Sequence, residues 1–256
     1  MKKQTSKIQV KKIKIDQETI EYAVRTGGPR NIFFLHGLNT SWRFWVKVLP
    51  SIPHQYTCYA LSLPKYGQHR INHYLETVEK FIKQKEAGKI LLVGHSLGGI
   101  IALQLASKGL DFERITLVNV PMFSQAPDLT SRTLKYWKNK LETDPIIKKT
   151  FLIIPARIKR FKKFFLRAPL ESYLEGFSDV LEQSIVTDLD KVKKKIPIMV
   201  VDGRLDFLLW LCQGKSLYKR LRPEAIIKLF DYHFIPQTRP KKLAKIIDQF
   251  FSSAGS

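Results

Sequence analysis

The chain contains 256 residues with a formal net charge of +22, and 44% of its residues are hydrophobic. This length and apolar content predict one large globular domain with its own core, and they exclude an intrinsically disordered chain. No apolar run approaches the roughly 18 residues of a membrane span. The lysine-rich beginning lacks the apolar segment of a secretory signal, so a cytoplasmic location is expected.

The two cysteines, Cys58 and Cys212, both lie in apolar surroundings, which favours buried thiols over a disulfide or a metal pair. Neither C-x-x-C nor H-E-x-x-H spacing occurs, so no metal site is predicted. The large positive charge bears on solubility and partners rather than on the fold.

Short apolar runs, separated by turn residues and amphipathic stretches, organise the chain. They predict an antiparallel edge hairpin over residues 8–15 and 17–24, then strands over 31–35, 56–61, 90–93, 114–120, 196–201 and 225–230. Helices are expected over 71–82, 100–106 and 243–251. A shorter helix carrying Trp42 and Trp45 would be capped by Thr40 or Ser41. Strands that alternate with helices in this way predict a parallel sheet with helices on both faces.

The central stretch is K-I-L-L-V-G-H-S-L-G-G over residues 89–99, in which residues 94–98 fit G-x-S-x-G between a buried strand and a helix. Such a turn forces Ser96 into a strained backbone conformation, and the small Gly94 and Gly98 let the strand and helix pack closely. The hydroxyl then stands at a helix N-terminus, where backbone N–H groups favour a developing anion. We therefore expect Ser96 to be a nucleophile.

A serine nucleophile needs a base, and the base needs an acid that fixes its tautomer. Asp206 follows the strand over 196–201, His233 follows the strand over 225–230, and the carboxyl ends of parallel strands converge. The chain order Ser96, Asp206, His233 is the order expected for a nucleophile on such an elbow. Asp202 and Asp231 are the alternatives for the acid.

Two further features complete the predicted site. The amides of Leu38, in the loop after the strand over 31–35, and Leu97, directly after the nucleophile, are expected to form an oxyanion hole. His36 and His95 lie in loops defined by their backbone, and we expect them to orient or pack rather than to act as bases.

These residues resemble the signatures of α/β-hydrolases of the esterase, lipase and thioesterase group. The matching segments are Leu35-His36-Gly37, the elbow over 94–99, Gly203-Arg204-Leu205-Asp206 and Tyr232-His233-Phe234. The resemblance spans residues 8–251 and implies an α/β fold with a mostly parallel eight-stranded sheet, a covalent acyl-serine intermediate and no cofactor. Tyr232 departs from the family, which often has a glycine before the base, and Ser62 stands where an aspartate is common.

Residues 122–180 stand in the place of the family's variable helical cap, so 1–121 and 181–256 are expected to form the hydrolase core. Between Arg132 and Arg167 the cap carries twelve Lys or Arg and two acidic residues, interleaved with aromatic ones. This segment fits a lid over an acyl pocket, an interfacial helix on an anionic membrane, or a docking surface for an acidic carrier protein. A solvated lysine-rich surface is the alternative that needs no partner. No nucleic-acid-binding motif accompanies the charge, so nucleic acid is not expected.

Together these patterns predict a serine hydrolase that cleaves an ester or thioester of an acyl chain, carried either by a small molecule or by a carrier protein. Acyl transfer and carbon–carbon bond hydrolysis by the same three residues remain alternatives. So does a catalytically silent fold that serves as a membrane or protein adaptor through its basic cap. Epoxide and haloalkane chemistry on this fold resembles enzymes with a carboxylate nucleophile, and Ser96 argues against it.

Overall fold

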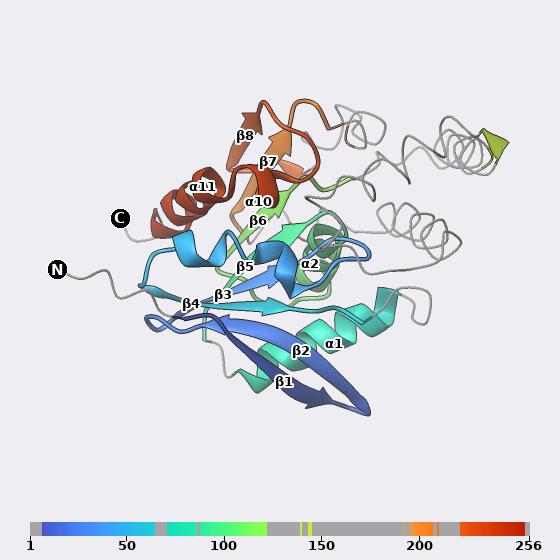
Figure 1. The fold of residues 1–256 in the computed structure, drawn as a ribbon, viewed down its shortest axis with the longest axis vertical. Helices are drawn as coiled ribbons and strands as arrows, with labels where there is room; N and C mark the ends of the chain where they lie inside the picture. The colour runs from blue at the N-terminus through green and yellow to red at the C-terminus, as the bar shows by residue number, and fades with distance from the viewer. Residues whose placement is uncertain are drawn as a thin grey trace.

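The structure is a computed structural model that describes residues 7–64, 71–85, 88–121, 139, 143–144, 192, 196–206, 209 and 221–253. Within them the strands form one eight-stranded sheet in the order β1-β2-β4-β3-β5-β6-β7-β8, with the β1–β2 hairpin at one edge and β8 at the other (Figure 1). The predicted α/β fold is confirmed. The predicted cap lies outside the described residues apart from positions 139, 143 and 144, so the expected domain boundaries stay predictions.

The strands match the expected apolar runs to within a few residues. Their bounds are β1 Gln9–Ile15, β2 Glu18–Arg25, β3 Arg30–Leu35, β4 Tyr56–Leu61, β5 Ile90–His95, β6 Arg114–Val118, β7 Ile198–Gly203 and β8 Ala225–Leu229. Only the β1–β2 and β2–β4 pairs are antiparallel. The remaining pairs are parallel, with Leu35 opposite Gly94, His95 opposite Val118 and Gly203 opposite Leu229. The loops that follow β3, β5, β6, β7 and β8 therefore leave the sheet along the same edge.

Side chains along each buried strand alternate between two apolar layers, as the pleat of a strand requires. Phe33 and Leu35 pack in the layer that holds helices α1 (Ile71–Gln84) and α2 (Leu97–Ser107). Ile32 and Phe34 pack in the opposite layer, which holds α11 (Pro240–Ser252). Helix α2 is buried along almost its whole length, which explains why its sequence is apolar on every side.

The short helix expected after Ser41 is two separate turns. Turn η1 spans Trp42–Trp45 and turn η2 spans Leu49–Ser51, both of the 3-10 type, and Ser41 caps the first by accepting from the N–H of Arg43 at 3.4 Å. Pro50 has no N–H to donate to the preceding turn, so a continuous α-helix cannot run through this segment. A second short helix, α10, spans Ile235–Thr238 and leads into α11.

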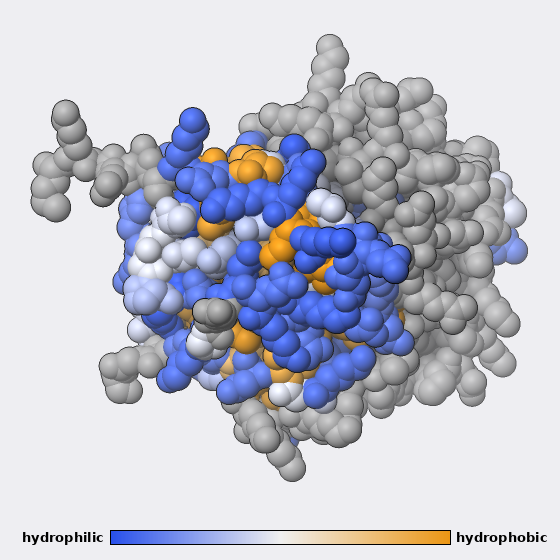
Figure 2. All heavy atoms as spheres, turned by 90° about the horizontal axis from the view of Figure 1, so that it is seen from below, coloured by the Kyte–Doolittle hydropathy of each residue, from blue (hydrophilic) through white to orange (hydrophobic). Residues whose placement is uncertain are grey.

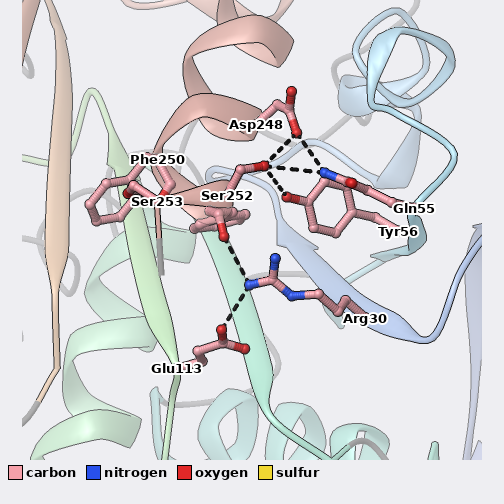
Figure 3. A network of polar contacts seen from close by, with 9 residues as sticks. Arg30, Gln55, Tyr56, Glu113, Asp248, Phe250, Ser252 and Ser253 are labelled. Carbon is pink, nitrogen blue, oxygen red and sulfur yellow. Dashed lines mark hydrogen bonds and ion pairs between the residues drawn. The ribbon is translucent and has the colours of Figure 1, made fainter. Parts of the chain in front are cut away.

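A polar network holds the end of α11 against the amino ends of the parallel strands (Figure 3). This is the edge of the sheet opposite to the one where Ser96, Asp206 and His233 lie. Arg30, the first residue of β3, donates to Glu113 at 2.7 Å and to the carbonyl of Phe251 at 2.8 Å. Beside it, the hydroxyls of Tyr56 and Ser252 lie 3.1 Å apart. Because these residues come from β3, β4 and the last turn of α11, the network closes the C-terminal helix onto the amino ends of the strands.

The face that carries the β1–β2 hairpin and α1 is covered mostly by hydrophilic residues, with hydrophobic ones in small separate groups (Figure 2). Lys11, Lys12 and Lys14 of the edge strand β1 are exposed, and lysines protect an edge strand from pairing with another sheet. Within the described ranges, no helix is long and apolar enough to cross a bilayer.

Of the two cysteines, Cys58 is a buried free thiol, and burial raises its pKa to about 11. Cys212 lies outside the described residues.

Candidate active site

Ser96 occupies a strained turn between β5 and α2. Its φ of 50° and ψ of −120° are outside the regions that a serine normally adopts, a strain worth about 1–3 kcal/mol. The turn is held because the Ser96 N–H donates to the carbonyl of Val118 in β6 at 3.0 Å, while the Ser96 carbonyl accepts from Gly99 at 2.9 Å. The predicted elbow is therefore present, with Ser96 only 8% exposed at the start of α2.

Close backbone approach around the elbow explains its glycines. A Cβ on Gly98 would lie 2.4 Å from the carbonyl oxygen of Leu35, and a Cβ on Gly94 would lie 2.6 Å from the carbonyl oxygen of Gly98. Neither contact is tolerable for a side chain. Glycine at both positions lets α2 begin directly beneath the ends of β3 and β5.

His233 and Asp206 meet across the ends of β8 and β7. The loops that carry them are joined by backbone hydrogen bonds from Arg204 to Leu229 at 2.8 Å and from Leu205 to Asp231 at 3.0 Å. Nδ1 of His233 lies 2.7 Å from Oδ2 of Asp206, whose side chain is 1% exposed. The structure thus brings together the two residues predicted to be base and acid.

The other two carboxylates considered for the acid are placed differently. Asp231 forms an ion pair with Arg239 at 3.0 Å and accepts from the N–H of Tyr232 at 2.8 Å. Asp202 is buried within β7 itself, before the loop that carries Asp206. The carboxylate beside the His233 ring is that of Asp206.

Asn119, one residue beyond β6, is a contact of Asp206 that the sequence did not predict. Its Nδ2 donates to Oδ2 of Asp206 at 2.6 Å, and the side chain is fully buried. Burial would raise the pKa of Asp206, but the charge and hydrogen bond of His233, together with the Asn119 amide, outweigh burial and lower it. The signal was a polar residue at the end of an apolar strand, which the prediction had included within the strand over 114–120.

A hydrogen bond also connects His233 to the elbow. Nε2 of His95, the residue before Ser96, lies 2.8 Å from the backbone carbonyl oxygen of His233. The centroids of the two imidazole rings are 4.8 Å apart. Since His95 and Ser96 are adjacent, this contact fixes the backbone of His233 relative to the elbow.

The loop after β3 lies against Ser96. A Cβ on Gly37 would be 3.1 Å from Cβ of Ser96, which places the next residue, Leu38, beside the elbow. His36 holds this loop: Nε2 accepts from the N–H of Leu63 at 2.8 Å, so Nδ1 carries the hydrogen and donates to the carbonyl of Gly37 at 2.7 Å. Burial lowers the pKa of His36 to about 4, so its ring is neutral.

The two amides predicted for the oxyanion hole are available as donors. Among the described residues, neither the N–H of Leu38 nor that of Leu97 meets a protein acceptor. Leu97 is the first residue of α2, where backbone N–H groups have no partner within the helix. No group of three metal-ligating side chains is present in the described part of the chain.

Curated relatives include an esterase that aligns with most of the chain. The chain is 23% identical over 227 residues to the pimeloyl-[acyl-carrier protein] methyl ester esterase of Vibrio atlanticus, covering 80% of this chain and 86% of that one. It is 30% identical over 99 residues to the dihydrolipoyllysine-residue acetyltransferase component of the acetoin cleaving system of Cupriavidus necator. That match covers 36% of this chain and 26% of the relative, and a 97-residue match to a Haemophilus influenzae protein covers 38% of that relative.

Solved structures show the same fold. An esterase from Thermogutta terrifontis superposes with a TM-score of 0.69 at 16% identity, covering 97% of this chain and all of that chain. The sequence model that describes the alpha/beta hydrolase family matches residues 32–237, which is most of the chain. The sheet with its strand order and the strained turn at Ser96 agree with this match, and esterases are among the relatives. The chain therefore belongs to the alpha/beta hydrolase family.

Proposed function

We propose that this hydrolase cleaves carboxylic esters or thioesters of acyl chains through an acyl-serine intermediate. The observation that carries the proposal is the 2.7 Å contact between Nδ1 of His233 and the buried carboxylate of Asp206. The backbone carbonyl of His233 in turn accepts from His95, the residue before Ser96. A carboxylate at Nδ1 of His233 fixes the tautomer in which this nitrogen carries the hydrogen, so Nε2 is left with the lone pair that a general base needs.

In the first half-reaction, Oγ of Ser96 attacks the acyl carbon while Nε2 of His233 takes the hydroxyl proton. The carbonyl oxygen becomes an oxyanion that accepts from the N–H groups of Leu38 and Leu97. When this intermediate collapses, the bond to the leaving oxygen or sulfur breaks and His233 returns its proton to the leaving group. An alcohol or thiol departs, and the acyl group stays on Ser96.

In the second half-reaction, water attacks the acyl-serine while His233 takes one of its protons. Collapse of the second oxyanion breaks the bond to Oγ of Ser96, and the proton on His233 returns to the serine. The carboxylic acid leaves and the site is restored. Asp206 stays ionised throughout and stabilises the imidazolium that forms twice in each cycle.

The proposed substrate is an acyl ester presented by an acidic carrier protein. The relatives aligned over most of this chain include three that are named for a methyl ester on an acyl-carrier protein. A net charge of +22 would attract an acidic carrier over distances of about a Debye length.

The test is hydrolysis of a series of esters and thioesters of increasing acyl length by wild type, Ser96→Ala and Ser253→Ala. Ser253 is an exposed serine whose hydroxyl donates to the carbonyl of Phe250 in the C-terminal helix, so it is a matched control. Activity should disappear in Ser96→Ala and persist in Ser253→Ala. A serine-directed phosphonate should add mass to the peptide that contains Ser96. Equal turnover by the wild type and Ser96→Ala would overturn the mechanism.

Two further arms separate the alternatives. Adding an alcohol or thiol acceptor distinguishes hydrolysis, which releases only acid, from acyl transfer, which forms a new ester or thioester. Comparing one ester free and on an acidic carrier protein, at rising salt, tests the carrier: kcat/KM should fall with salt only for the carrier-borne ester. If no substrate turns over and the phosphonate does not label Ser96, the proposed mechanism fails and the catalytically silent adaptor becomes the favoured function.

A further inference from the structure

A buried histidine that the proposed mechanism does not use lies where the loops of the site meet. His95 is the last residue of β5 and is 2% exposed. Its ring centroid lies 4.5 Å from that of Phe44 and 4.8 Å from that of His233. It thus contacts the base from one side while it precedes the nucleophile in the chain.

The contacts of the His95 ring define its tautomer. Nε2 lies 2.8 Å from the carbonyl oxygen of His233, and since a carbonyl can only accept, Nε2 carries the hydrogen. Nδ1 is buried and has no hydrogen-bond partner among the described residues. It lies against the loop after β3, because a Cβ on Gly37 would be 2.8 Å from it. A second proton on Nδ1 would therefore be buried without an acceptor.

The surroundings keep this ring neutral. Burial, and then the neighbouring His233, lower the pKa of His95 well below its ordinary value. The titratable groups that act on it are His233, Asp206 and His36. With Nε2 engaged and Nδ1 enclosed, His95 has no nitrogen available to a substrate. It is therefore not a second base.

We propose that His95 is a positioning residue that fixes the backbone of His233 relative to Ser96 and packs against the loop after β3, which carries Leu38. The proposal rests on the proposed function, because it assigns His95 a role in the reaction of Ser96 and His233. One hydrogen bond, from Nε2 of His95 to the backbone carbonyl of His233, joins two residues that are 138 positions apart in the sequence. Without it, the loop after β8 loses its direct bond to the elbow, and a displacement of about 1 Å between reacting groups can cost roughly a hundredfold in rate.

The first experiment compares His95→Gln with His95→Phe on the best ester found in the substrate series. Glutamine retains an N–H donor at the distance of Nε2, whereas phenylalanine retains the ring but cannot donate. We expect kcat to fall roughly 10- to 100-fold in His95→Phe with KM changed less than about twofold, and His95→Gln to recover most of the loss. Near-UV circular dichroism and thermal melting verify that both variants fold. Equal kcat in all three proteins, or equal loss in both variants, would overturn the proposal.

The second experiment does not need activity. In protein labelled with ¹⁵N-histidine, His95 should give the signal of a neutral ring protonated at Nε2 that persists through the pH range in which an ordinary histidine titrates, and this signal should vanish in His95→Gln. A His95 signal that titrates near its ordinary pKa would refute the assigned tautomer. If Ser96→Ala proves as active as the wild type, the proposed function fails while this spectrum still reports on the His95 contact.

Discussion

The amide of Asn119 and the imidazole of His233 donate to the same oxygen of Asp206, at 2.6 Å and 2.7 Å. The N–H of Leu209 reaches the other oxygen at 3.4 Å. Asn119 holds this position with a φ of 49°, in a region that asparagine tolerates better than most residues. The carboxylate is thus oriented by Asn119, just beyond β6, as well as by His233.

Removing the side chain in Asn119→Gly should reduce kcat about 10- to 100-fold, the range expected for a hydrogen bond to a buried charge. Glycine accepts the same backbone conformation, so strain does not confuse the result. Thr116→Val is the matched control, since Thr116 is fully buried on β6, three residues before Asn119, and its hydroxyl has no partner within the described ranges. If both variants keep full activity, Asn119 does not orient the acid.

Gly98→Ala should disrupt the elbow, because the new methyl group would lie 2.4 Å from the carbonyl oxygen of Leu35. Overpacking of this kind costs about 1–3 kcal/mol, and the shift of α2 away from β3 should also lower activity. Gly88→Ala provides the comparison, since nothing lies within 4 Å of a Cβ there. Chemical denaturation measures both variants, and equal midpoints would contradict the close approach.

Stability should fall on acidification between about pH 6.5 and 4. The pKa of His36 is lowered to about 4 in the folded protein, so in this window the unfolded chain binds a proton that the folded chain does not. The contribution of neutral His36 to the free energy of unfolding is fully present above the pKa that His36 has in the unfolded chain. It is lost as pH falls, at about 1.4 kcal/mol per pH unit.

His36→Gln should reduce that slope, because it removes one of the buried titrating groups. Urea unfolding at several pH values measures the free energy of unfolding for both proteins. His95, whose pKa is also lowered, should leave part of the slope in place. Identical slopes in wild type and His36→Gln would show that His36 does not titrate in this way.

Arg30→Gln should destabilise the protein without altering the site. Arg30 donates to Glu113 and to the carbonyl of Phe251 at the opposite end of the sheet, contacts worth about 1–2 kcal/mol together. Arg43→Gln, which breaks an exposed ion pair with Glu21, should cost less than about 1 kcal/mol. Thermal melting ranks the two, and kcat per folded molecule should stay at the wild-type value. A fall in kcat would mean that the network also positions the site.

The sequence predicted the elbow at Ser96 because a strained turn is a local feature, and it predicted the neighbourhood of Asp206 and His233 because the carboxyl ends of parallel strands converge. A strained turn needs its own glycines, and residues after strands follow from the positions of the strands. The contacts of Asn119 and His95 could not be predicted in this way. Each depends on the register between strands far apart in the chain, and that register is set by packing across the whole sheet.

The same register has a consequence for folding kinetics. His95, Asn119, Asp206 and His233 follow or end four successive strands of the sheet, β5 to β8, so their contacts close loops of 87 and 27 residues as well as the one of 138. Folding is slow when contacts lie far apart in the sequence, because the entropy cost of closing the loop comes before the contact can stabilise it. During refolding, the circular dichroism of the helices should therefore recover before esterase activity does, because the site is complete only when the last strand has docked.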